Sequence, residues 1–448
     1  MAPLGWLGIV RLGLVQTALG AVVVLTTSTL NRVMVVEMAL PAMLPGALVA
    51  LHYALQVFRP RLGFGSDVGG RRTPWIVGGM AALCLGGVTA SIATALMATH
   101  VALGIMLAVL GFIGIGFGVG AAGTTLLVLL AKRTDERRRP AAATIVWVMM
   151  IAGFILTAAV AGNLLDPFSP MRLVAVAAGI SVVAFVVALF AVRGVEGEVP
   201  APETGVEQRN AGGSFRQALG EVWHEPQARR FAVFVFISML AFSAQDLILE
   251  PFAGTVFGFT PGETTKLSGI QNSGVLIGMT LVALLGSAVG GRRFGSLKMW
   301  TILGCVGSAA ALFSLTLAGL NGPPWPLRVC VFALGFTNGV YAVAAIGSMM
   351  GLVGKGTASR EGVRMGLWGA AQAVAFGLGG FLGTAASDLA RLLLGSPALA
   401  YASVFAIEAG LFVLAALLAL RVGDTGPAPQ DVQQDIQNAT GRNAHAIA

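Results

Sequence analysis

Long runs of apolar residues recur along the chain, and they constrain its fold more than any other feature. A helix that crosses the hydrocarbon core of a bilayer needs about 20 mostly apolar residues. Runs close to that length lie at 12–37, 41–58, 75–98, 101–131, 141–163, 171–192, 230–250, 266–289, 299–320, 327–353, 363–386 and 400–420. Inside lipid, backbone polar groups must be hydrogen-bonded within their own segment. The pattern therefore predicts an all-α integral membrane protein with about 12 transmembrane helices.

The composition excludes the two main alternatives to a membrane protein. Of the 448 residues, 56% are apolar and only 11% are charged. A soluble globular domain carries about 25% charged residues, and a disordered chain is poor in apolar ones. The net charge of +8 does not indicate nucleic-acid binding, because the cations lie in short loops between apolar runs. A soluble enzyme and a nucleic-acid partner are both excluded.

The distribution of Lys and Arg predicts the orientation in the membrane. Cytoplasmic loops carry an excess of these residues. When both termini are placed in the cytoplasm, all of the 28 cations lie on that side except Arg32, Arg172, Lys266, Arg328 and Arg391. We therefore expect a multi-pass membrane protein with both termini in the cytoplasm.

A polar stretch divides the apolar runs into two sets of six. The predicted parts are an N-terminal six-helix bundle (1–193), a cytoplasmic linker (194–228), a C-terminal six-helix bundle (229–421) and a disordered cytoplasmic tail (422–448). The two bundles also share a sequence repeat, because GSDVGGRR at 65–72 recurs as GSAVGGRR at 286–293 after the second span of each half. This repeat indicates two pseudo-equivalent halves in the same orientation.

The loop after the second span resembles motif A of the major facilitator superfamily, with the matching residues Gly63, Asp67, Gly70, Arg71 and Arg72. The glycines permit a tight turn, and the arginines hold the loop at the anionic leaflet. The resemblance implies that this loop latches the two halves in one state of a transport cycle. The alternative is a positively charged inner loop with incidental glycines. The second copy has Ala288 in place of Asp67, so we expect only one charged latch.

Two polar clusters interrupt equivalent spans of the two halves. Ionisable groups inside spans are costly and are candidates for function. The candidates in the first span are Asn31, Arg32 and Glu37, and those in the seventh span are Gln245, Asp246 and Glu250. We expect both spans to line a central cavity. Arg32 and Asp246 are predicted to form a buried ion pair there, with Glu37 and Glu250 near the outer mouth. The alternative is that these groups cap helix ends at the outer interface.

The same clusters carry a closer resemblance. TLNRVMVVE at 29–37 and QDLILEPFAG at 245–254 are similar to segments of the PucC/LhaA family, also called the bacteriochlorophyll delivery family. Its members are proteins of the major facilitator type from anoxygenic phototrophic bacteria. The resemblance implies a role in light-harvesting complex assembly in a photosynthetic membrane. It also implies bacteriochlorophyll or a related tetrapyrrole as cargo, with antenna polypeptides and pigment-synthesis enzymes as further partners.

His52 is the histidine that lies well inside a predicted span, one turn from Gln56. We expect it to make a hydrogen bond between helices, and the alternative is an axial ligand for the magnesium of a pigment. Interhelical hydrogen bonds are also expected for Asn272, Asn338, Gln372 and Glu408. Cys84, Cys305 and Cys330 are far apart in apolar sequence, so we predict neither a disulfide nor a metal site.

No catalytic arrangement is recognisable in the sequence. It contains no Ser/His/Asp arrangement, no redox motif and no phosphate-binding GxxxxGK[ST] loop. We therefore expect no enzyme and no catalytic cofactor. The preferred hypothesis is a membrane protein that binds bacteriochlorophyll, or a late precursor, and delivers it to antenna polypeptides. Two alternatives remain open, namely a proton-coupled transporter of another small molecule and a non-transporting assembly scaffold.

Overall fold

The computed structural model describes residues 4–56, 71–135, 138–197, 223–285, 296–353 and 361–421. These residues are helical without any strand. Eleven of the described helices are long and apolar enough to cross a membrane, and a shorter apolar helix, Met43–Leu55, stands in the place of the second span. The chain is thus an all-α, multi-pass membrane protein, as the apolar runs predict.

The N-terminal half contains six spans. The first begins as α1 (Trp6–Val24) and continues through η1 (Leu25–Thr29), α2 (Leu30–Arg32) and η2 (Val33–Glu37), followed by α3 (Met43–Leu55), α5 (Thr73–Met97), α6 (Val101–Arg133), α7 (Arg139–Leu164) and α8 (Pro170–Val192). The C-terminal half contains α10 (Pro226–Phe257), α11 (Pro261–Leu285), α13 (Leu297–Asn321), α14 (Leu327–Val353), α15 (Glu361–Leu394) and α16 (Pro397–Arg421). Helix α10 thus begins three residues before the expected start of the C-terminal bundle at 229, and the expected tail lies outside the described residues.

Local sequence explains where many of these helices begin. Proline suits the first helical turn, where no N–H is needed for the helix ladder, and it opens α8, α10, α11 and α16. Ser169 caps α8 by accepting a hydrogen bond from the N–H of Arg172 at 3.1 Å. Ser296 caps α13 in the same way through the N–H of Met299, at 3.3 Å. Such caps satisfy amide groups that the helix itself leaves free.

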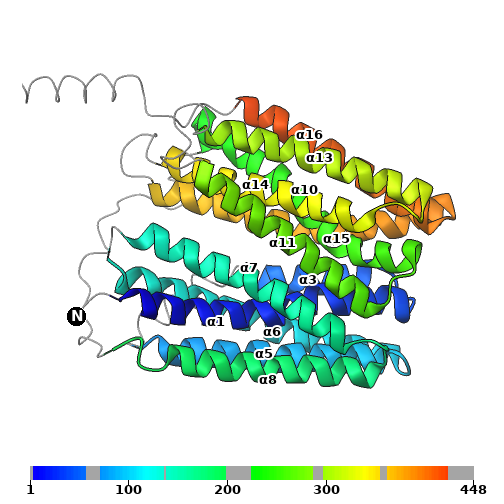
Figure 1. Cartoon of the computed structure of the whole chain (residues 1–448), viewed down its shortest axis with the longest axis horizontal. Helices are drawn as coiled ribbons and strands as arrows, with labels where there is room; N and C mark the ends of the chain where they lie inside the picture. Colours follow the sequence, from blue (N-terminus) through cyan, green and yellow to red (C-terminus); the bar gives the residue numbers. More distant parts are fainter. Residues whose placement is uncertain are drawn as a thin grey trace, which may run out of the picture.

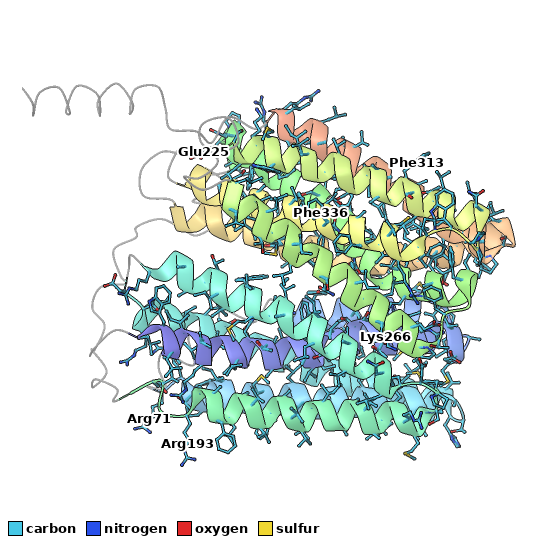
Figure 2. All side chains as sticks on the ribbon, viewed as in Figure 1. Arg71, Arg193, Glu225, Lys266, Phe313 and Phe336 are labelled. Atoms are coloured by element: carbon cyan, nitrogen blue, oxygen red, sulfur yellow. The ribbon has the colours of Figure 1, made fainter. Side chains whose placement is uncertain are left out.

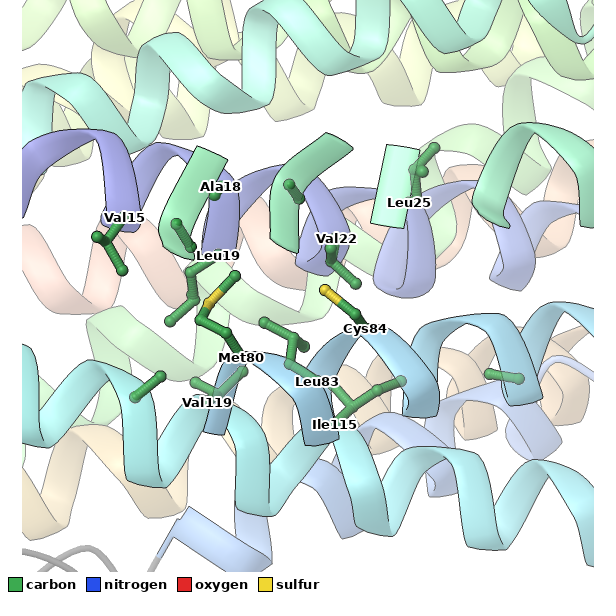
Figure 3. Packing of buried hydrophobic residues seen from close by; sticks show 14 of the residues in the cluster. Val15, Ala18, Leu19, Val22, Leu25, Met80, Leu83, Cys84, Ile115 and Val119 are labelled. Atoms are coloured by element: carbon green, nitrogen blue, oxygen red, sulfur yellow. The ribbon is translucent and has the colours of Figure 1, made fainter. Parts of the chain in front are cut away.

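Each half has its own apolar core. Figure 3 shows part of the N-terminal core, where Val22 of α1 lies near Leu83 and Cys84 of α5 and Ile115 of α6. Small residues allow close approach of the helices, because a Cβ added at Gly86 of α5 would lie 2.7 Å from the backbone of α6. Large apolar side chains such as Leu85, Met106, Phe190, Phe313 and Leu392 remain exposed on the outside, as expected for a surface that faces lipid.

The two halves lie one above the other in Figure 1 and meet mainly at one end. We call this the outer end, and we call the opposite end, where α1 begins and α16 ends, the inner end. At the outer end Asp166, after α7, accepts a hydrogen bond from Thr260 at 3.0 Å, and the N–H groups of Ala42 and Met43 donate to Asp388 of α15 at 3.0 and 2.7 Å. From these contacts the ribbons of the halves diverge toward the inner end (Figure 1).

Candidate functional site between the two halves

The first span changes its helical repeat where its polar residues lie. Segments η1 and η2 are π-helical, with backbone hydrogen bonds that span five residues instead of four. In such turns, residues five positions apart come onto one side of the helix. Arg32 and Glu37 have this spacing. The local geometry therefore brings the cation and the carboxylate of the first span together.

Arg32 is enclosed between the two halves, with only 2% of its surface exposed. Its Nη1 forms an ion pair with Oε1 of Glu37, whose side chain is 32% exposed. Its Nη2 donates a hydrogen bond to the backbone carbonyl of Phe259, beyond α10, at 2.7 Å. The predicted ion pair between Arg32 and Asp246 is therefore wrong, because the π-helical turn provides a carboxylate within the same span.

Asn31 is buried and joins α2, in the first span, to α10. Its Nδ2 donates a hydrogen bond to the carbonyl oxygen of Leu247 at 2.5 Å. That carbonyl lies four residues before Pro251, a proline within the helix. Because proline has no N–H, it cannot make the helical hydrogen bond to Leu247. Asn31 supplies the missing donor from the other half of the molecule.

Hydroxyl groups of the first span extend this junction toward α10 and α11. Ser28 donates a hydrogen bond to Oε1 of Glu250, which is 2% exposed. Thr29 and Thr265 share a hydrogen bond of 3.1 Å. The structure thus unites four of the predicted residues, Asn31, Arg32, Glu37 and Glu250, in one polar junction that connects the halves near their outer end.

Gln245 and Asp246 are adjacent in sequence but point to different surroundings. Asp246 is exposed although both of its neighbours are buried, and Nε2 of Gln271 on α11 donates to its Oδ1 at 3.5 Å. Asp246 therefore lies at an exposed position about two-thirds of the way along α10. Gln245 is completely buried, and neither its Nε2 nor its Oε1 has a hydrogen-bond partner among the described residues. Gln245 thus belongs to the interior of the C-terminal half.

His52 is 2% exposed on α3. Its Nε2 lies 2.8 Å from Nε2 of Gln56 one turn later, and its ring packs edge-on against Tyr53. The backbone at His52 also approaches Gly116 of α6 closely. These contacts place His52 in the packing between α3 and α6.

Only part of the predicted gating loop can be compared with the structure, because Gly63, Asp67 and Gly70 lie outside the described residues. Arg71 is exposed at the inner end of the N-terminal half, where Figure 2 also shows Arg193. The N–H of Arg72 donates to Oε1 of Glu196, which follows α8. The N–H and the hydroxyl of Thr73 donate to Oε2 of the same carboxylate at 2.9 and 2.7 Å. Sequence reasoning missed Glu196, which caps the N-terminus of α5.

The electrostatics of Glu196 follow from these hydrogen bonds. Burial alone would raise its pKa, because burial disfavours the charged form of a carboxyl group. The hydrogen bonds from Arg72 and Thr73 outweigh burial, and they hold the pKa of Glu196 below its ordinary value. The carboxylate therefore fastens the start of α5 to the end of α8 at the inner end.

Sequence reasoning also did not place the polar partners on α11 and α16. On α11, Gln271 contacts the candidate Asp246, while Thr265 and Ser268 contact Thr29 and Ser28 of the first span. Glu408 of α16 is 2% exposed, and neither of its carboxylate oxygens has a hydrogen-bond partner among the described residues. Two of the expected interhelical contacts do form: Asn338 accepts a hydrogen bond from Ser308 at 2.8 Å, and Gln372 approaches the sulfur of Met239 at 3.9 Å.

An apolar recess lies beside the π-helical part of the first span. It is lined by Val22, Leu25, Leu173 and Val176, among others, and has room for about one water molecule. This space is far too small for a drug-sized ligand. A larger molecule would have to lie between the halves. Within the described ranges no three His, Cys, Asp or Glu side chains converge as a metal site would require.

Solved structures of transporters share this architecture. The crystal structure of the nucleoside transporter NupG superposes with a TM-score of 0.62 at 18% identity, over 93% of this chain and 98% of that one. The D-xylose–proton symporter gives a TM-score of 0.64 at 16% identity, over 93% and 98%. At these identities the similarity concerns the fold alone. It confirms the expected major facilitator fold.

Sequence comparison gives the family. The chain is 53% identical over 421 residues to the bacteriochlorophyll synthase 44.5 kDa chain of Rhodobacter capsulatus, over 94% of this chain and 96% of that protein. It is 30% identical to protein PucC of Cereibacter sphaeroides, over 92% and 91%. A family model described as PUCC protein matches residues 29–426, which include both polar clusters. The chain therefore belongs to the PucC family.

Proposed function

We propose that this protein takes part in assembling light-harvesting complexes, by binding bacteriochlorophyll or a late precursor between its halves and delivering it to antenna polypeptides. The observation that carries the proposal is the 53% identity, over nearly the full chain, to a protein named for bacteriochlorophyll synthesis. Membership of the PucC family supports a role in assembling photosynthetic complexes.

The arrangement of the two halves supports this function. The polar junction of Asn31, Arg32 and Glu250 holds the halves together near the outer end, while Asp246 is exposed about three turns further toward the inner end than the end of α10. A pigment with a long apolar tail needs mostly apolar walls and a few polar groups that orient its ring. Asp246 and Gln271 are such groups, and we assign to them the polar contacts of the cargo. His52 is buried against Gln56, so we assign it a role in packing.

The proposed orientation of the protein in the membrane follows from the distribution of Lys and Arg between its two ends. We propose that the inner end faces the cytoplasm of a photosynthetic bacterium, because most Lys and Arg residues within the described ranges lie at that end. Because the ribbons of the halves diverge toward the inner end (Figure 1), we propose that a pigment made on the cytoplasmic side enters between the halves there. Release to antenna helices would follow when the halves rock against each other.

We propose that the protein handles the pigment without catalysing its synthesis. The relative with a synthase name raises the alternative of an enzyme subunit. Among the described residues, Ser28, Thr29 and Asn31 make contacts between the halves, and many other polar side chains bond to carbonyls of their own helix. A handling role therefore explains both the name of the relative and the transporter fold. Synthetic enzymes would then be partners that hand over the pigment.

The test is the absorption spectrum of the protein, purified in mild detergent from a phototrophic host. We expect a near-infrared band with about one pigment per chain, and a several-fold loss of that band when Asp246→Leu and Gln271→Leu are combined. The matched control is Glu263→Gln, at an exposed pair with Arg328, which should keep the full band. Colourless protein that takes up another solute with protons, or that only retains antenna polypeptides, would overturn the proposal in favour of a transporter or a scaffold.

A further inference from the structure

The polar junction between the halves contains two carboxylates and one cation. Arg32 forms its ion pair with Glu37, which the π-helical turn brings to the same side of the first span. Glu250 of α10 lies in the same junction, and only 2% of its surface is exposed. Its Oε1 accepts a hydrogen bond from Ser28 of the other half, and its Oε2 has no partner among the described residues. Within the described ranges, the junction thus holds one carboxylate more than it has cations.

Arg32 lies about one turn beyond Glu250 toward the outer end. Ser28, which donates to Glu250, precedes Arg32 by four residues in the first span. Gly254 follows Glu250 by four residues on α10, and a Cβ added there would lie 3.0 Å from Nε of Arg32. Both Nη atoms of Arg32 already donate to other acceptors. The guanidinium is thus near Glu250, but its ion pair in this arrangement is with the other carboxylate.

Among the described residues, the helices packed against α10 provide no ion-pair partner for Glu250. The charged groups in the middle and outer parts of these helices are Glu263 and Lys266 on α11, Arg328 on α14, Asp388 and Arg391 on α15, and Glu408 on α16. Lys266 packs on Gly162 of α7, and Arg391 donates a hydrogen bond to a tyrosine hydroxyl. On α10 itself, Asp246 lies one turn toward the inner end and is also acidic. Glu250 therefore has no cation of its own in this arrangement.

The contact between Ser28 and Glu250 joins different halves, so separation of the outer end would part the two side chains and let water reach the carboxyl group. An ionised carboxylate without a counter-charge is very unfavourable once it is buried, and such groups become neutral. We propose that Glu250 is a proton-binding site, and that closure of the outer end takes up one proton. While the outer end is open, a hydronium ion from the outer aqueous phase gives its proton to the carboxylate of Glu250. Closure then buries the neutral acid, whatever cargo the halves carry.

The direction of the pH dependence follows from the number of protons that each arrangement binds. Above about pH 4.3, a hydrated glutamate is ionised, so the open arrangement has no proton on Glu250 while the closed one has one. A rise in pH therefore favours the open arrangement. The ratio of open to closed protein should increase about tenfold per pH unit, as long as the closed arrangement keeps its proton.

Maleimide labelling of the purified full chain measures the open population. Ala42 is 2% exposed at the contact between the halves, so Ala42→Cys reacts when the outer end separates. Its rate is divided by that of Ala98→Cys, at an exposed position after α5, which corrects for ionisation of the thiol at each pH. At low reagent concentration this relative rate is proportional to the open population, even when that population is small. It should rise about tenfold per pH unit between pH 5 and 7.

Two substitutions of similar shape separate the charge balance from a merely structural role. Glu250→Gln is neutral at every pH, so the relative rate should stay low and lose its pH dependence. Glu37→Gln leaves Arg32 free to pair with Glu250, so closure no longer needs a proton and the dependence should fall well below tenfold per pH unit. This second variant also covers the case in which Glu250→Gln does not fold. Glu263→Gln, at an exposed pair with Arg328, is the matched control and should keep the full dependence.

Three results would each overturn the proposal. The first is a relative rate that stays constant from pH 5 to 7 without further substitution, because Glu250 would then keep one protonation state in both arrangements. The second is a pH dependence that survives Glu250→Gln, since Asp166 or Asp388 at the outer contacts would then be the titrating group. The third is a rate that responds to sodium and not to pH, because the oxygens of Ser28, Ser268 and Glu250 would then hold a metal ion instead of a proton.

Discussion

Asn31 donates its side-chain amide to the backbone carbonyl of Leu247, across the boundary between the two halves and over 2.5 Å. Pro251 leaves that carbonyl without the donor that an unbroken helix would supply. Inside a membrane, a backbone group that loses its helical partner has to be satisfied by a neighbouring helix or by water. A polar residue in one half thus completes the backbone hydrogen bonding of a helix in the other half.

This relationship predicts an interaction energy between two substitutions. Asn31→Leu should lower the free energy of unfolding by about 0.5–2 kcal/mol, the range for hydrogen bonds between membrane helices. Pro251→Ala restores an N–H four residues after Leu247. In that background Asn31→Leu should therefore have a smaller effect, since the carbonyl keeps a donor.

Thermal unfolding of the four proteins in detergent measures this coupling as a double-mutant cycle. Additive effects of the two substitutions would show that Asn31 and Pro251 act independently. Asn163→Leu is a suitable control, because Asn163 is exposed and donates to the carbonyl of Ala159 within its own helix. Its effect should be the same with and without Pro251→Ala.

The contact between Arg32 and Gly254 gives the second prediction. A Cβ added at Gly254 would lie 3.0 Å from both Nε and Nη2 of Arg32. Gly254→Ala should push the guanidinium away from Phe259 and Glu37, and it should destabilise the protein by about 1–3 kcal/mol, as overpacking does. Gly410→Ala is the matched control, because nothing lies within 4 Å of a Cβ there. It should change the thermal midpoint little or raise it slightly, since alanine is the better helix former.

Most of the fold could be predicted from the sequence. A span in lipid needs a run of apolar residues and backbone hydrogen bonds within its own helix, and both requirements can be read from the local sequence. The predicted span 171–192 appears as Pro170–Val192, and 299–320 appears as Leu297–Asn321. The ends of α10 were harder to predict. The apolar run stops at Glu250, but the helix continues through Pro251 to Phe257, because Asn31 and the packing around Phe252 support the turn after the proline.

The candidate site was only partly predictable, since its geometry depends on departures from the ordinary helical repeat. In a regular α-helix with 3.6 residues per turn, the side chains of Arg32 and Glu37 would point to different sides of the helix. The sequence therefore favoured a partner for Arg32 on another span. The π-helical turn instead makes Glu37 the partner. Gln245 and Asp246 are about 100° apart around α10, so only one of them can face the space between the halves. Which one does so depends on how α10 packs against α16.

Glu196 leads to a prediction about pH. Hydrogen bonds from Arg72 and Thr73 lower the pKa of its folded-state carboxyl below the ordinary 4.5. A lowered folded pKa contributes stability that is fully present above the ordinary value and is lost as the pH falls through the folded value. Glu196→Gln should therefore lower the thermal midpoint at neutral pH, and its difference from wild type should shrink as the pH falls below about 4.5.

The control for Glu196 is a carboxylate in a weak surface pair. Glu263 lies 3.9 Å from Arg328, with side chains 39% and 63% exposed, and glutamine can keep its cap on α11. Glu263→Gln should shift the midpoint little at any of these pH values. A difference for Glu196→Gln that stays constant down to pH 3 would contradict the assignment of the stabilisation to the ionised carboxylate.

Asp388 gives a prediction about movement of the halves. Its two oxygens accept hydrogen bonds from the N–H groups of Ala42 and Met43 at the start of α3, so the carboxylate caps a helix of the other half. Asp388→Asn keeps only one acceptor oxygen and removes the charge. A loss of about 1 kcal/mol should raise the population with a separated outer end about fivefold.

Ala42→Cys reports this opening, because Ala42 is 2% exposed in the closed arrangement. Its reaction with a maleimide in detergent should therefore be about five times faster when Asp388→Asn is also present. Ala39→Cys, at an exposed position, should react quickly in both backgrounds, and the buried Cys84, Cys305 and Cys330 set the baseline. Equal rates for Ala42→Cys in the two backgrounds would mean that other outer contacts hold the halves without Asp388.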